Sequence, residues 1–289
     1  MGRSKNLLIK IGLGILVFYF LLVIGRDVSK SFYLLGQDRL NVVLFQKEPV
    51  YFSYDLHGRS SYSIVFYPDL KVKVPGGYGD YRLGGLLKLA ELEKKPAIIQ
   101  NTFSSLSRSL VDFYYYPSRS EIYFGKDNTQ LRLNKLSLMA MLSSKSNASF
   151  PERILTYFLL LRQNKDQQLD PVTLAQAPEN YQGYFYKESL RNEKINLRLV
   201  YRQAYSTAAN LSHILEGEGI RVVDIVQEAT EDEAQAKKCF LVQSVKQPSK
   251  TAIYLARYFG CTIKTGVQTG VYDLVFYLNN LEQSWEINQ

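Results

Sequence analysis

The sequence predicts an α/β and α+β protein with an N-terminal transmembrane helix, a mixed α/β domain and a small β-α-β repeat domain with two helices on one sheet. An apolar run at the N-terminus, an alternation of strand-like and helix-like segments, and a repeated β-α-β pattern support this. The expected boundaries are 1–30 for a cytoplasmic tip and signal anchor, 38–163 for the α/β domain, 164–192 for a linker and 193–289 for the repeat domain.

The N-terminal run LLIKIGLGILVFYFLLVIG, residues 7–25, is long enough to cross a bilayer if Lys10 extends its ammonium to the headgroups. No small-residue cleavage site follows it, so we expect a retained signal anchor. Basic residues before the run predict a cytoplasmic N-terminus, with the later domains extracytoplasmic. No later segment is long enough to span, so we expect a single-pass protein of the cell membrane. A buried helix of a soluble protein is the alternative.

Composition narrows the expected partners. The apolar share of 46% is ordinary for a globular chain. The formal net charge of +8 is spread as isolated Lys and Arg, which does not indicate a nucleic-acid partner. Attraction to anionic lipid or to an anionic wall polymer is one use of this charge, and surface solubility is the other.

Within the α/β domain, β-branched and aromatic runs predict strands at 40–45, 50–54, 62–67, 72–74 and 111–116. The second and third are joined by a glycine-containing connection typical of a hairpin. Helical spacing marks 83–92, 98–110, 136–142 and 154–161. Residues 164–192 are polar and lose any sustained period, so they are expected to be a linker that only spaces the domains.

The C-terminal part repeats itself. A helical pattern over residues 207–215 recurs at 251–259, and each helix is flanked by strand-like runs, 197–201 and 220–226 or 239–243 and 262–264. Ser206 and Ser249 are the expected N-caps, and Gly219 and Gly260 stand where the helices should end. A last strand at 273–278 completes the sheet.

The chain has two cysteines, Cys239 and Cys261, and both fall in the repeat domain. Outside the cytoplasm they could form one disulfide, but two buried free thiols fit the sequence equally well. Neither has the spacing or the nearby histidine of a metal site, so no metal is predicted.

Residues 195–278 carry the runs INLRLVYRQ, TAANLSHILEGEG, IRVVDIV and VYDLVFYL, and this segment resembles the LytR C-terminal domain of bacterial envelope proteins. That domain follows LytR-CpsA-Psr catalytic domains. Its first strand commonly runs into an Asn-Gly-Thr-like turn, where this chain has RQAYS at residues 202–206.

The runs RLNVVLF (39–45), SIVFYPDLKVKVP (63–75), GGYG (76–79) and VDFYYY (111–116) resemble the LytR-CpsA-Psr domain itself. The resemblance implies transfer of glycopolymers from a polyprenyl-pyrophosphate carrier to peptidoglycan, with acidic residues holding a divalent cation and arginines holding the pyrophosphate. Gln46-Lys47 stands in place of the family's Gly-Asp, and only Pro68-Asp69 remains of its Pro-Arg-Asp. The resemblance therefore implies a degenerate catalytic domain.

Five residues are candidates for phosphate or glycan binding: Asp69, Lys71, Arg82, Arg108 and Asp112. Asp69 is the surviving acid of the family pattern, and Asp112 matches the family's Asp before tyrosines. The three cations lie near the glycine-rich turn or on the helix after it. A turn role for Asp69, surface solvation for the cations and a strand-start role for Asp112 are the structural alternatives.

The sequence thus predicts an extracytoplasmic envelope protein that binds wall glycopolymer or organises the envelope without catalysis and without a cofactor. The expected partners are the membrane and peptidoglycan, an anionic wall glycopolymer or a polyprenyl-phosphate lipid. One alternative is a Mg²⁺-dependent phosphotransferase using residues such as Asp55, Asp69 and Arg59. Another is a scaffold that recruits other envelope proteins.

Overall fold

The computed structural model describes Gly25 and residues 37–58, 60–125, 138–162, 167–228, 238–244, 247–266 and 270–287. The predicted anchor at 7–25 lies outside these residues except for Gly25. Within the described ranges, no helix combines the length and the apolar character needed to cross a bilayer.

A six-stranded mixed sheet forms the N-terminal half, in the order β7-β6-β1-β2-β3-β8. The strands β1 (Arg39–Leu44), β2 (Val50–Asp55) and β3 (Tyr62–Val65) form an antiparallel meander. Strand β6 (Phe113–Tyr116) runs parallel to β1 and antiparallel to β7 (Lys145–Ser146), and β8 (Gln167–Leu169) runs parallel to β3. The predicted strands at 40–45, 50–54, 62–67 and 111–116 thus lie side by side.

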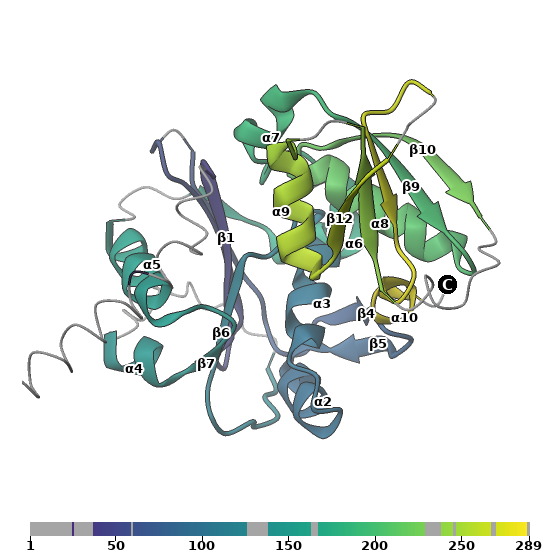
Figure 1. Cartoon of the computed structure of the whole chain (residues 1–289). Helices are drawn as coiled ribbons and strands as arrows, with labels where there is room; N and C mark the ends of the chain where they lie inside the picture. The colour runs from purple at the N-terminus through teal and green to yellow at the C-terminus, as the bar shows by residue number, and fades with distance from the viewer. Residues whose placement is uncertain are drawn as a thin grey trace, which may run out of the picture.

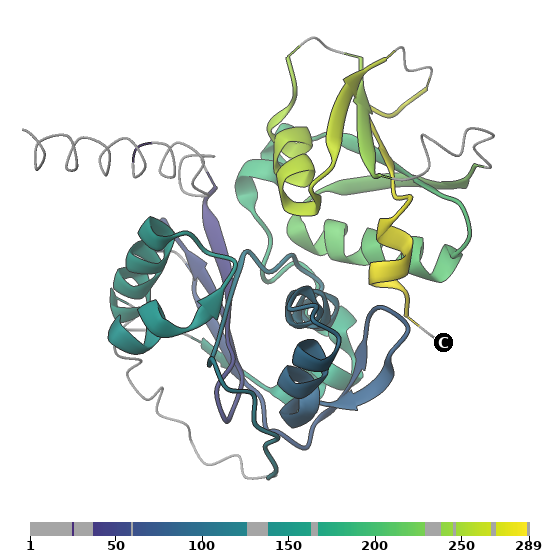
Figure 2. The same cartoon turned by 60° about the horizontal axis from the view of Figure 1, so that its bottom comes forward.

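Helices cover both faces of this sheet (Figure 2). Leu40, Val42 and Leu44 of β1 face the layer that contains α4 (Leu138–Ser143) and α5 (Phe150–Arg162). Val43 and Phe45 face the opposite layer, which contains α2 (Leu86–Leu92), α3 (Ala97–Ser107) and α6 (Pro171–Gln176). All six residues of β1 are buried because apolar layers lie on both sides of the strand. A separate hairpin, β4 (Lys71–Val74) and β5 (Gly79–Arg82), leads through the 3₁₀ turn η2 (Leu83–Gly85) into α2.

The C-terminal half is a five-stranded sheet in the order β10-β9-β13-β11-β12 (Figure 1). Each repeat is a parallel β-α-β unit: β9 (Asn196–Tyr201), α8 (Tyr205–Glu218) and β10 (Arg221–Gln227), then β11 (Phe240–Gln243), α9 (Lys250–Phe259) and β12 (Thr262–Thr265). Strand β13 (Leu274–Tyr277) lies between the two units, and α10 (Leu281–Trp285) follows it. Both long helices share one apolar cluster with this sheet, as the repeat predicts.

The helix ends agree with the prediction at three of four positions. Gly219 and Gly260 adopt the left-handed conformation, and the Ser249 side chain accepts from the Ala252 N–H at 3.1 Å. The prediction for Ser206 is wrong because α8 begins at Tyr205, so its N-cap is Ala204, two residues earlier, and the Ala204 side chain cannot cap. The Glu282 carboxylate of α10 instead accepts the backbone N–H groups of residues 202–204.

The cysteines form a disulfide, which settles the choice between a bridge and free thiols. Cys239 lies directly before β11 and Cys261 directly before β12, and their Cα atoms are 5.0 Å apart. The parallel pairing of these strands places the two residues side by side. The bridge therefore joins the two strands of the second repeat.

Residues 164–192, expected to be only a linker, contain regular structure where described. The segment adds β8 to the first sheet and includes α6, the 3₁₀ turn η3 (Pro178–Tyr181) and most of α7 (Glu188–Glu193). Its polar composition concealed these elements because β8 pairs through its backbone and because only a few separated side chains, among them Leu174, Phe185 and Lys187, enter the interior completely.

The two halves meet where α8 crosses the end of α3. A Cβ atom on Gly217 would lie 1.7 Å from the carbonyl oxygen of Arg108, so only glycine permits this approach. The Arg108 guanidinium also donates to Asn210 Oδ1 at 2.9 Å. The halves therefore form a close backbone contact.

Candidate functional site

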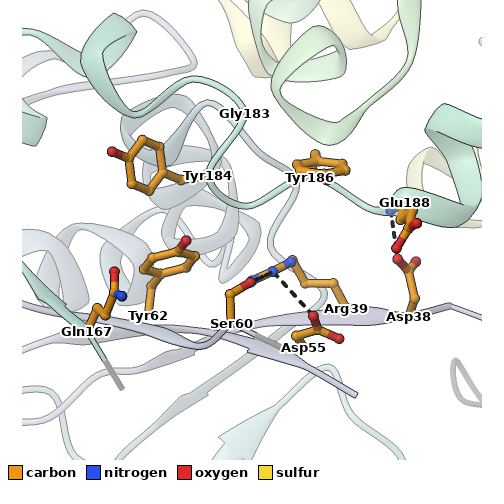
Figure 3. Close-up of a pocket in the computed structure, with 10 residues that line it drawn as sticks. All are labelled: Asp38, Arg39, Asp55, Ser60, Tyr62, Gln167, Gly183, Tyr184, Tyr186 and Glu188. Atoms are coloured by element: carbon orange, nitrogen blue, oxygen red, sulfur yellow. Dashed lines mark hydrogen bonds and ion pairs between the residues drawn. The ribbon is translucent and has the colours of Figure 1, made fainter. Parts of the chain in front are cut away.

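An open cavity of about 470 Å³ lies between one end of strands β1, β2, β3 and β8 of the first sheet and the chain segment that leads to α7 (Figure 3). Figure 3 shows Arg39, Asp55, Ser60 and Tyr62 along the sheet side, with Tyr184 and Tyr186 on the opposite wall. Asp38, Gln167, Gly183 and Glu188 complete the lining. We call it the tyrosine pocket.

Arg39 is fixed at the base of the tyrosine pocket. It is the first residue of β1, opposite Asp55 at the end of β2. Its guanidinium donates to Ser53 Oγ at 2.9 Å and Ser60 Oγ at 2.7 Å, and lies 3.9 Å from an oxygen of Asp55. Among the described lining residues Arg39 is the single cation, and protein groups already engage it.

Aromatic rings form the apolar part of the wall. The rings of Tyr62 and Tyr184 meet edge to face, with their centroids 5.4 Å apart. The ring of Tyr62 also meets that of Phe185, at a centroid distance of 5.9 Å. Tyr184 is partly exposed, whereas Phe185 is fully buried. The buried Phe185 holds this wall in place while the tyrosines on either side of it reach the cavity.

The described lining of the pocket is acidic. It contains three carboxylates and one guanidinium, a formal charge of −2. Burial raises the pKa of Asp38, but hydrogen bonds from Ser189 and Glu188 outweigh burial and leave that pKa below its usual value. Asp38 is therefore ionised at neutral pH, and it fixes the start of α7 against the sheet.

Three of the residues predicted from the sequence come together elsewhere, on the β4–β5 hairpin. Lys71 pairs with Arg82 across the hairpin, and the Arg82 guanidinium lies 3.8 Å from Asp69. The cationic side chains are solvent-exposed. Their role in phosphate or glycan binding stays a prediction.

The other two predicted residues lie at the junction of the halves. Arg108 ends α3 in the left-handed conformation and bonds to α8. Asp112 is buried in a group that we call the junction cluster, formed by Asp112, Lys187, Glu218 and Tyr254. The structure thus distributes the five candidates between two places, neither of them the tyrosine pocket.

The junction cluster joins three parts of the chain. The Lys187 ammonium lies 3.2 Å from Asp112 and contacts Glu218, while the Tyr254 hydroxyl donates to Glu218 at 2.7 Å. Glu218 also accepts the Leu110 N–H at 2.8 Å. Two carboxylates share one lysine here. Burial raises the pKa of Asp112 to about 7, with Lys187 opposing and Glu218 adding to this shift.

The residues named for a phosphotransferase alternative are separated as well. Asp55 lines the tyrosine pocket, Asp69 lies by the hairpin and Arg59 falls outside the described residues. Over the described ranges, no group of three His, Cys, Asp or Glu side chains is arranged to hold a metal ion. The two aspartates of the pocket, Asp38 and Asp55, both already accept hydrogen bonds from backbone N–H groups.

Apart from Asp55, the tyrosine pocket was not predicted from the sequence. Its residues are far apart in the chain and belong to two segments that were interpreted separately. The run YQGYFY at 181–186 was the available signal, since four aromatic residues within a polar stretch are unusual for a plain linker.

No family model and no curated protein matches this sequence. Among solved structures, it is similar to the LytR-CPS2A-psr family protein YwtF (TagT) with bound octaprenyl pyrophosphate lipid. That similarity covers 52% of this chain and 92% of the other, at 10% identity and a TM-score of 0.34. TagT bound to LIIa-WTA and B. subtilis TagT each match over 78% of this chain and 92% of their own, at 11% identity and a TM-score of 0.23. Likenesses this weak establish neither the family nor the activity of this chain.

Proposed function

We propose that this chain is a single-pass, extracytoplasmic envelope protein that binds the sugar part of a wall glycan in the tyrosine pocket without catalysis. The observation that carries this proposal is the described pocket lining, in which tyrosine rings stand beside carboxylates and an amide. Its one cation within the described ranges, Arg39, is engaged by Ser53 and Ser60. The proposal includes no cofactor.

The lining suits a sugar because sugars present two kinds of surface. Their hydroxyl groups donate to carboxylate and amide oxygens, which Asp55, Glu188 and Gln167 supply. Their C–H faces are weakly positive and are attracted to the negative faces of aromatic rings. A pocket with apolar walls and a few polar groups is the usual form of a small-ligand site.

The same lining disfavours a phosphate-rich ligand. The described lining carries a formal charge of −2, which repels phosphate, and the charge of Arg39 is already engaged by Ser53, Ser60 and Asp55. The uncharged sugars of peptidoglycan or of a wall glycopolymer therefore fit better than a polyprenyl phosphate. This is also the reason for preferring binding to phosphoryl transfer.

Two features support the proposed location. The apolar run at 7–25 fits a signal anchor, and the Cys239–Cys261 disulfide is typical of a compartment outside the reducing cytosol. Protease added to cells with a permeabilised wall should remove the folded part of the full chain. Protection in such cells, with digestion only after membrane lysis, would contradict the proposed orientation.

Sugar binding is tested by titrating the full chain in detergent micelles with short N-acetylglucosamine oligomers, using calorimetry. Tyr184→Ala is expected to weaken binding about tenfold, or ~1.4 kcal/mol. Tyr81→Ala is the matched control because Tyr81 is similarly exposed but lies on β5, outside the pocket. Inorganic pyrophosphate should not compete. The absence of sugar binding, or an equal loss of sugar affinity in both variants, would overturn the proposal. Mg²⁺-dependent hydrolysis of a polyprenyl pyrophosphate by the full chain would favour the phosphotransferase alternative.

A further inference from the structure

Helix α5 exposes an apolar side as well as packing one against the sheet. Tyr157, Leu159 and Leu160 are partly buried against the core, together with the buried polar Glu152 and Thr156. On the outside, Phe150, Phe158 and Leu161 are 59%, 57% and 49% exposed. A surface helix normally buries its apolar stripe and exposes its polar one. The exposed side of α5 therefore lacks a partner of matching polarity within the described part of the chain.

The buried polar groups of α5 are satisfied by nearby groups of the same segment. The Glu152 carboxylate accepts the N–H and the hydroxyl of Ser149, both at 2.8 Å. The Thr156 hydroxyl donates to the carbonyl of Glu152 at 2.7 Å. These local bonds explain how two polar groups are buried on the inner side of α5, but they do not explain the apolar surface outside.

That surface extends onto the neighbouring helix. Met139 of α4 and Leu155 of α5 are also exposed, and the two helices pack together beside the first sheet (Figure 2). We call the exposed side chains Met139, Phe150, Leu155, Phe158 and Leu161 the α5 outer face. Exposed apolar groups gathered on one element mark an interaction surface more often than scattered ones do.

Within residues 138–162, which carry the α5 outer face, the exposed charges have one sign. Between residues 138 and 162 the cations are Lys145, Arg153 and Arg162, and the only acidic residue is the buried Glu152. Lys145 and Arg162 are exposed to solvent. Large apolar side chains beside exposed cations, without an exposed carboxylate, match the boundary of a bilayer that contains anionic lipid.

We propose that the α5 outer face lies on the outer surface of an anionic lipid bilayer, with α5 parallel to the membrane plane. At 13 residues the helix extends about 20 Å, too short to cross a bilayer. The stretch 26–36 between the predicted anchor and the described part spans about 40 Å at most, which keeps the folded part close to the lipid. The inference rests on the proposed membrane anchor and is independent of sugar binding.

The experiment places a tryptophan on this face of the full chain. The protein has a single tryptophan, Trp285, which is buried and gives a constant background. Phe158→Trp adds a second one at an exposed position, and Leu92→Trp is the matched control on α2, in the helical layer on the opposite face of the sheet. Each variant is reconstituted at one copy per nanodisc in a bilayer that contains phosphatidylglycerol and brominated lipid. Brominated lipid quenches the fluorescence of a tryptophan that it contacts.

We expect brominated lipid to quench the Phe158→Trp variant several times more strongly than the Leu92→Trp variant, and less strongly when Leu155→Glu is added. Equal quenching in both tryptophan variants, or none in either, would overturn the proposal. A blue-shifted but unquenched Phe158→Trp signal would also overturn it, because another part of the chain would then cover the face. Loss of sugar binding leaves this result unaffected, so the two proposals fail separately.

Discussion

The tyrosine pocket and the junction cluster are built from the same kinds of groups but differ in their access to water. Each holds one cation beside carboxylates, Arg39 with Asp55 in the pocket and Lys187 with Asp112 in the cluster. The side chains of Arg39 and Asp55 are each 6% exposed at the base of the open pocket, whereas those of Lys187 and Glu218 are completely buried. Charge near water can bind a ligand, while the same charge sealed between two halves can only hold them together.

The carboxylates of the two sites also differ in their protonation. In the cluster, burial raises the pKa of Asp112 to about 7. In the pocket, hydrogen bonds from α7 outweigh burial and lower the pKa of Asp38. A surplus carboxylate is tolerated as an anion only where backbone and solvent stabilise it.

The largest expected effect is that of Lys187→Met. It leaves two buried carboxylates without their shared cation, so the free energy of unfolding should fall by about 3–5 kcal/mol. Urea unfolding of the full chain in detergent micelles measures this. Lys88→Met, at an exposed ion pair with Glu91, is the control and should leave the unfolding midpoint in place. A wild-type midpoint for Lys187→Met would mean that the cluster does not hold the halves together.

The second effect is a pH dependence from Asp112. Its folded-state pKa of about 7 stands above its ordinary value of 3.8, so the folded chain holds this proton more tightly than the unfolded chain does. The stabilisation from this proton is complete below about pH 4 and is lost as the pH rises towards 7, by up to ~1.4 kcal/mol per pH unit.

Asp112→Asn should remove that slope, since the amide does not titrate. Asp112 faces Lys187, Glu218 and Tyr254, and Tyr258 lies further along α9. The pKa values of Lys187 and of the two tyrosines are raised above their ordinary values, so these groups stay in one protonation state over this range. The difference between the two unfolding midpoints, followed from pH 4 to pH 8, therefore reports mainly on Asp112. Parallel curves for the two proteins would contradict the raised pKa.

A smaller loss is expected for Arg39→Met in the pocket. The variant removes hydrogen bonds to Ser53 and Ser60. Water in the open cavity can replace the bond to the partly exposed Ser60 but not the bond to the fully buried Ser53, so we expect about 1–2 kcal/mol by urea unfolding. A loss as large as that of Lys187→Met would show that the pocket base is also structural, and would remove the distinction between the two sites.

The smallest effect on stability should be that of Tyr184→Ala. The ring is partly exposed and meets its neighbours by edge contacts, so the free energy of unfolding should change by about 1 kcal/mol or less. Sugar affinity should fall at the same time. A stability loss well above this value would place Tyr184 in the core rather than in a binding surface.

Much of the local structure could be predicted from the residues alone. Apolar and β-branched runs located β1, β2, β3 and β6, and the internal repeat located both C-terminal β-α-β units. Gly219, Gly260 and Ser249 cap helices as predicted because capping depends on a few adjacent residues. Strand β8 was missed because a short polar strand is specified by the backbone of its neighbour rather than by its own side chains.

The candidate sites show where this kind of inference ends. Lys71 and Arg82 pair because a short hairpin brings them together, which sequence spacing can suggest. Asp112 and Lys187 are 75 residues apart and Asp38 and Glu188 are 150 apart, so no local pattern connects them.

The sequence by itself determined the elements, the repeat and the apolar N-terminal run, because periodicity and capping act over a few residues. Only the tertiary structure decided that Asp112 is enclosed, that Asp38 borders an open cavity and that the two cysteines are bridged. The physical reason is that burial and pairing depend on which distant segments pack against a residue.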